Sequence, residues 1–250
     1  RRQRQMCIRD RCSTRSQRTS SGRSALLPAD ECIGPAPRPL AKVILSLTPS
    51  DLGLSVEARG EALKHAVYVA SPGLGERADF LLASDKFWVR SFESHDPLQT
   101  VYLVGGVSCT DQALNCKDSR GVRGFRFEGK DRLVDVSKNV LPAAPTLSED
   151  DVRRYQAYAE PVPSLDVSRL WQVPVLRWVI EFDPDAPLAG DPRYYNDWAY
   201  LHFGFLVWNG KRFDLMDKVD RSRWPCRPVA EGTAACSGPL DNRGDRFVTP

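Results

Sequence analysis

This chain lacks the residue patterns that mark several large classes of enzyme. Its 250 residues contain no G-x-S-x-G nucleophile turn, no G-x-x-x-x-G-K-[ST] phosphate loop, no G-x-G-x-x-G dinucleotide turn and no H-E-x-x-H zinc helix. Only three histidines, His65, His95 and His202, are available as an imidazole base near neutral pH. The sequence therefore gives little support to nucleophilic, nucleotide-dependent or zinc-dependent catalysis.

Long apolar runs are also missing. The longest, residues 200–208, spans nine residues and includes His202, whereas a membrane-spanning helix needs about 20 apolar residues. We therefore expect no transmembrane segment. A content of 42% apolar residues with six tryptophans excludes collagen-like, coiled-coil and fully disordered proteins.

The excess of positive charge is confined to the first 24 residues. These hold eight arginines and one aspartate, and subtracting them from the chain's 35 basic and 32 acidic residues leaves 27 basic and 31 acidic residues. The tract RRQRQMCIRDR resembles the conceptual translation of short-read sequencing adaptor DNA, so we expect residues 1–24 to be a non-native tail. Without this tail, nucleic-acid binding has no support. Residues 25–39 are predicted to be a proline-rich lead-in.

Cysteine spacing predicts two disulfide bonds. Outside the tail, four of the five cysteines form close pairs, Cys109 with Cys116 and Cys226 with Cys236, and Cys32 is left over. Closing loops of this size stabilises a fold by about 2.5 kcal/mol each. Reduced cysteines are the alternative, and a zinc site is disfavoured because there is no C-x-x-C pair. Since disulfides persist in oxidising compartments, we expect a periplasmic or extracellular protein.

Short runs of β-branched and aromatic residues predict a mainly β fold of antiparallel strands, either sandwich-like or built as two similar subdomains. In the first half, the predicted strands lie at residues 41–47, 66–70, 87–92 and 100–104. Two segments, 124–140 and 204–219, each begin with Gly-Phe and contain a turn dipeptide, Glu128-Gly129 or Asn209-Gly210. They predict two similar hairpins with two-residue turns, one in each subdomain.

One short helix is predicted between the two halves. The hydroxyl of Ser148 can cap it, Asp151 occupies the capping-box position, and the helix should end near Ala159. Its proline-rich flanks make residues 142–165 a predicted linker. The linker separates an N-terminal β subdomain at residues 40–141 from an aromatic-rich C-terminal β subdomain at residues 166–250.

The strands of the C-terminal half are predicted from its aromatic residues. Twelve aromatic residues lie between Trp171 and Trp224, and we expect most of them to fill a β core. In residues 177–183, Trp178, Ile180 and Phe182 would share one face of a strand. Val179 and Glu181 would lie on the opposite face. Residues 200–208 are apolar at almost every position, so we expect an interior strand covered on both faces.

Four residues of one segment are candidates for binding a partner: Arg193, Tyr194, Tyr195 and Trp198. Aromatic rings set among Asp, Arg and Asn are typical of a loop, and loops carry a large share of binding residues. Tyr, Trp and Arg also supply much of the binding energy at protein interfaces. The leading hypothesis is a non-catalytic exported binding protein that engages a protein or cell-envelope partner and needs no cofactor or metal.

The alternative hypothesis is a secreted hydrolase acting on glycans, with His202 as a candidate base in an aromatic-lined groove. Such an enzyme should have a concave pocket in which carboxylates of shifted pKa converge. It should also place His202 beside an acid at the floor of a cleft. A binding protein should instead present exposed aromatic residues over a filled core.

Overall fold

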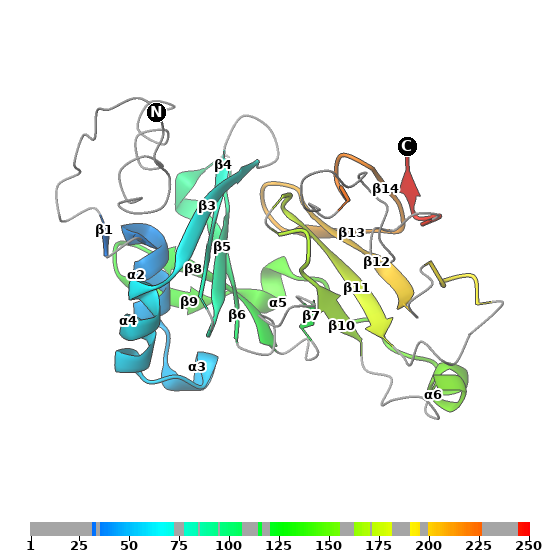
Figure 1. Cartoon of the computed structure of the whole chain (residues 1–250), viewed down its shortest axis with the longest axis horizontal. Helices are drawn as coiled ribbons and strands as arrows, with labels where there is room; N and C mark the ends of the chain where they lie inside the picture. The colour runs from blue at the N-terminus through cyan, green and yellow to red at the C-terminus, as the bar shows by residue number, and fades with distance from the viewer. Residues whose placement is uncertain are drawn as a thin grey trace.

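The computed structural model describes residues 32–33, 36–72, 78–84, 86–94, 96–106, 115–116, 121–155, 163–170, 172–181, 191–195, 200–226 and 245–250. These residues form a mainly β structure with two large antiparallel sheets, which confirms the predicted fold class (Figure 1). The helices are short by comparison.

The described elements follow one another along the chain in this order: β1 (Cys32–Ile33), β2 (Ala36–Pro37), α2 (Arg38–Ser46), α3 (Pro49–Leu52), α4 (Val56–Lys64), β3 (Val67–Pro72), β4 (Ala78–Ala83), β5 (Trp88–Phe92), η1 (Pro97–Gln99), β6 (Val101–Gly105), β7 (Asn115–Cys116), β8 (Val122–Glu128), β9 (Arg132–Asp135), α5 (Ser137–Val140), α6 (Glu149–Tyr155), β10 (Ser164–Asp166), β11 (Val175–Glu181), β12 (Tyr200–Trp208), β13 (Phe213–Met216), β14 (Val219–Asp220) and β15 (Val248–Thr249). None of the helices in the described residues is long and apolar enough to cross a membrane.

The first sheet has six strands in the order β3-β4-β5-β6-β8-β9, and helices α2 and α4 cover one of its faces (Figure 1). The prediction of a strand at residues 41–47 is wrong, because this segment lies in and just after helix α2. Its buried residues Leu40, Val43, Ile44 and Leu47 recur at three- and four-residue intervals, which is the spacing of one helix face. The buried residues of this segment therefore follow the helical spacing and not the alternation expected of a strand.

The second sheet has five strands in the order β13-β12-β11-β10-β7. Strand β7 comes from the N-terminal half of the chain but pairs with β10, so the pairing crosses between the two predicted halves. The predicted helix is confirmed as α6, where Ser148 Oγ accepts from Asp151 N at 3.1 Å and Asp151 Oδ2 accepts from Ser148 N at 3.3 Å. These two bonds form the predicted capping box.

One hydrophobic core contains residues of both sheets. Trp88 and Phe92 of the first sheet belong to the same buried cluster as Trp178 and Trp208 of the second. The rings of Phe92 and Trp208 are 5.8 Å apart between centroids, and Trp208 Nε1 donates to Glu93 O at 2.9 Å. The two predicted halves therefore pack through a common interior.

The two predicted hairpins are present, one in each sheet. Their connections are longer than the predicted two residues, because the closing pairs are Glu128 with Arg132 and Trp208 with Phe213. In the second hairpin, the Oδ1 atom of Asn209 accepts hydrogen bonds from the backbone N–H groups of Lys211 and Arg212, both at 2.9 Å. This side chain therefore closes a four-residue turn.

A bulge in β12 changes which side chains share a face of the second sheet. The register of β11 and β12 shifts between the pairs Arg177–Phe205 and Val179–His202. Between these pairs, Phe203 and Gly204 of β12 lie opposite the single residue Trp178 of β11, so β12 has one additional residue. Gly204 has a φ of +110°, which favours glycine. On a regular strand His202 and Trp208, six residues apart, would share a face, but the bulge places them on opposite faces. His202 contacts Phe205 at a ring distance of 4.8 Å, whereas Trp208 lies in the core between the sheets.

Candidate functional site

The segment Asp191 to Tyr195 lies against the start of β12 as the first half of a short hairpin. Tyr194 forms an isolated antiparallel bridge with Leu201, and His202 N donates to Arg193 O at 2.9 Å. Tyr195 N donates to Tyr200 O at 3.4 Å. Residues 196–199, which include the candidate Trp198, connect these two fixed points and lie outside the described residues.

Arg193 connects this hairpin to helix α6. Its Nη2 donates to Asp151 Oδ1 at 2.6 Å and to Asp191 Oδ2 at 2.8 Å, and its Nε donates to Asp191 Oδ1 at 3.1 Å. The hydrogen bond from Arg193 is the main reason that the pKa of Asp151 is below its usual range. The two carboxylates raise the pKa of Arg193 through the same hydrogen bonds. Arg193 therefore acts as an anchor of the hairpin as well as a candidate binding residue.

The ring of Tyr195 lies in the interior rather than on the surface. It is 6% exposed, stacks on Tyr200 at a centroid distance of 6.0 Å, and burial raises the pKa of its hydroxyl. Tyr194 is half-buried, and its carbonyl accepts from Arg246 Nη2 at 3.0 Å. Of the two tyrosines, only Tyr194 has surface to offer a partner.

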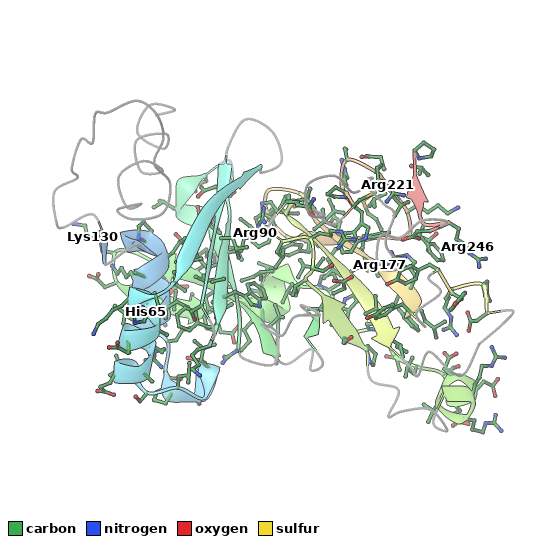
Figure 2. All side chains as sticks on the ribbon, viewed as in Figure 1. His65, Arg90, Lys130, Arg177, Arg221 and Arg246 are labelled. Atoms are coloured by element: carbon green, nitrogen blue, oxygen red, sulfur yellow. The ribbon has the colours of Figure 1, made fainter. Side chains whose placement is uncertain are left out.

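Arg177 on β11 of the second sheet (Figure 2) contacts a group of buried residues that consists of Tyr195, His202, Phe205 and Asp245. Arg177 and Asp245 form an ion pair in which both side chains are 0% exposed. The guanidinium carbon of Arg177 is 3.5 Å from the centroid of Tyr195 and 4.5 Å from that of Phe205. Cation–π contacts of this kind are strongest where water is excluded. Arg177 thus ties the Tyr195 ring to the second sheet.

His202 is a structural member of this group. It is 3% exposed, its Nδ1 accepts from Arg177 Nε at 2.8 Å, and its Nε2 is 2.7 Å from Asp217 O. This arrangement assigns the proton to Nε2, because Nδ1 is the acceptor. Burial, reinforced by the positive charge of Arg177, lowers the pKa of His202 to about 3. The imidazole is therefore neutral across the physiological range, with both nitrogens engaged.

A hollow lies elsewhere in the described structure, where β8, α5 and residues 141–144 meet β10 and β11. It has a volume of about 740 Å³. Burial alone would raise the pKa of Asp135 at its rim, but hydrogen bonds from Ser137 and Arg123 outweigh burial and hold this pKa below its usual value. Every other carboxyl group with a shifted pKa in the described residues is also shifted downward. These groups are held ionised, which does not suit a general acid.

The predicted disulfide cysteines are only partly described. Cys116 lies in β7, and Cys109 and Cys236 lie outside the described residues. Cys226 follows Pro225 and the buried Trp224, whose ring packs on Phe205 of the second sheet. The carbonyl of Cys226 accepts from Gln172 Nε2 at 2.8 Å. No group of three or more possible metal ligands is found within the described residues.

Sequence reasoning identified Arg193 and the loop but not the residues that hold it. Asp151 was expected only to cap its helix, yet it also binds Arg193, which is 42 residues away in the chain. Arg177 and Asp245 are 68 residues apart, and neither belongs to a recognisable motif. Comparison with protein-family models, curated proteins and solved structures finds no match for this chain.

Proposed function

We propose that this chain is a non-catalytic binding protein that engages a protein or cell-envelope partner through the hairpin at residues 191–201. The observation that carries this proposal is the fixed position of the hairpin arm at residues 191–195, which lies beside β12. Arg193 holds this arm to α6, and Tyr195 and Arg177 hold the same arm to the second sheet. A recognition element held in place loses less conformational entropy on binding than a free loop does.

Within this element the candidate residues have different roles. Arg193 and Tyr195 are positioning residues, since one is bound by two carboxylates and the other is buried. Tyr194 and Trp198 are the proposed anchors. An indole and a phenol ring offer large contact area at little cost in rotamer entropy.

The state of His202 favours binding over the alternative of glycan hydrolysis. A catalytic base must reach a substrate and bind a proton near the working pH. His202 is buried and has a pKa of about 3, and its two ring nitrogens contact Arg177 and a backbone carbonyl. We therefore assign His202 to the support of the hairpin.

The binding proposal is tested by capture from a cell-envelope extract on the immobilised protein. We expect Trp198→Ala and Tyr194→Ala each to reduce the captured partner at least about tenfold, as interface anchors do. Leu98→Ala is the matched control, because Leu98 is an apolar side chain that is 73% exposed on η1, outside the hairpin. Undiminished capture by both hairpin variants would remove the proposed surface.

We also propose that the protein is exported and that Cys226 pairs with Cys236. This is supported by the spacing of the two cysteines, since Cys236 follows Cys226 by ten residues in a segment without a helical or strand pattern. Disulfides persist outside the reducing cytosol. Peptide mapping of alkylated, unreduced protein should recover the peptides of Cys226 and Cys236 linked to each other. Recovery of both as alkylated peptides would contradict the pairing and the export argument.

A further inference from the structure

The turn between β12 and β13 presents an exposed asparagine that is followed directly by glycine. Asn209 is exposed, and within the residues that the structure describes, the N–H group of Gly210 donates to no acceptor. The backbone nitrogen after an asparagine can attack the side-chain amide carbon, and a glycine has no Cβ to obstruct this approach. No hydrogen bond has to break before the nitrogen of Gly210 reacts. The turn therefore leaves the attacking atom available.

The side-chain amide of Asn209 is held with its oxygen on backbone donors. Its Oδ1 accepts from Lys211 N and from Arg212 N, and its Nδ2 donates to Asp214 Oδ2 at 2.8 Å. Attack on the amide carbon places a negative charge on this oxygen. Two backbone N–H groups that already point at the oxygen stabilise such an oxyanion. The contacts of Asn209 thus support the attacked state of its amide.

We propose that Asn209 is a modification site at which the folded protein deamidates itself. The nitrogen of Gly210 loses its proton to hydroxide and forms a bond to Asn209 Cγ. The bond between Cγ and Nδ2 breaks, and Nδ2 takes a proton from water and leaves as ammonia. Water then opens the succinimide ring, giving aspartate by addition at Cγ or isoaspartate by addition at the backbone carbonyl carbon. Water is the only co-reactant, and no atom is oxidised or reduced.

Both products loosen the attachment of β13. This strand is at the edge of the second sheet, and in the described part of the chain it pairs only with β12. A carboxylate at position 209 cannot donate to Asp214, and the two negative charges repel each other within the turn. Isoaspartate also adds a methylene group to the backbone of the turn. The reaction therefore weakens the hairpin that holds Phe213 in the core between the sheets.

The reaction is tested by incubating the folded protein in mildly alkaline buffer and mapping its peptides by mass spectrometry after digestion in acid. Asn139 is the matched internal control, because it is exposed but the nitrogen that follows it, Val140 N, donates to Val136 O at 3.1 Å. Attack on Asn139 must break this hydrogen bond beside a β-branched side chain, so we expect Asn209 to convert at least about tenfold faster. Aspartate and isoaspartate should both appear at position 209. Equal rates at the two asparagines, or conversion of Asn209 only in urea, would overturn the proposal.

The effect on β13 is tested by amide hydrogen exchange of freshly prepared variants. Asn209→Asp reproduces one product and should speed exchange in residues 213–216 about fivefold, the value of one lost hydrogen bond. Adding Asp214→Asn removes the repulsion and should restore part of the protection. Gln99→Glu is the matched control, because it makes the same amide-to-acid change at an exposed position on η1, and it should leave exchange in β13 unchanged. Equal exchange of β13 in the wild type and Asn209→Asp would overturn the claim that deamidation loosens the hairpin.

Discussion

Replacing His202 by glutamine should remove one specific part of the protein's acid sensitivity. In the unfolded chain a histidine titrates near pH 6.5, whereas the buried His202 has a pKa of about 3. Between these values the unfolded state binds more protons than the folded state, so the free energy of unfolding falls as the pH falls through this window. Above pH 6.5 the contribution is constant, and below pH 3 the loss is complete.

The size of this effect follows from the two pKa values. Between pH 7 and pH 5 the wild type should lose about 2 kcal/mol of unfolding free energy through His202 alone. His202→Gln keeps a donor and an acceptor, costs stability at every pH, and should not show this additional loss. The carboxyl groups with lowered pKa change the free energy of unfolding mainly below pH 5, because their ordinary pKa values are 3.8 and 4.5.

Urea unfolding of both proteins at pH 5, 6 and 7 measures the difference. His65→Gln is the matched control, since His65 has an exposed side chain at the end of α4, away from the second sheet (Figure 2). We expect this variant to keep the pH dependence of the wild type. Equal pH dependence of the wild type and His202→Gln would show that the imidazole is not held neutral, and the reasoning on the buried group would be refuted.

Three other substitutions test the supports of the hairpin by the same unfolding measurement. Arg177→Met should cost about 3–5 kcal/mol by leaving Asp245 buried without its cation, and adding Asp245→Asn should restore part of the loss; a double variant no more stable than the single one would contradict this. Gly204→Ala should cost about 1–3 kcal/mol, because its φ is +110° and the new Cβ would lie 2.6 Å from Leu215 Cδ1; a neutral effect would argue against the bulge. Arg193→Lys should cost about 1–2 kcal/mol, since one ammonium group cannot reproduce the forked contacts, and an unchanged midpoint would show that Arg193 does not anchor the hairpin.

Local patterns in the sequence predicted the elements that depend on the hydrogen bonding or the polarity of neighbouring residues. The capping box at Ser148 and Asp151, the hairpin around Asn209-Gly210, although with a longer turn than predicted, and the alternation around Trp178 all appear in the structure. Each depends on residues a few positions apart. Such interactions can be recognised without knowledge of the fold.

The errors arose where two periods compete or where distant residues meet. Residues 41–47 are apolar at most positions, so alternation and helical spacing both fit, and packing of α2 on the first sheet decided in favour of the helix. A single bulge at Gly204 then moved His202 to the opposite face from Trp208. The contact of Arg177 with Asp245 depends on the tertiary structure, and no local pattern encodes it.

The binding role of the hairpin is tested most directly by photo-crosslinking. A photoreactive benzoylphenylalanine is placed at position 198, and in a second protein at the exposed position 98 of η1. After irradiation in a cell-envelope extract, position 198 should give a crosslinked product of defined mass and position 98 should not. A product from position 98 alone, or none from position 198, would contradict the proposed binding surface.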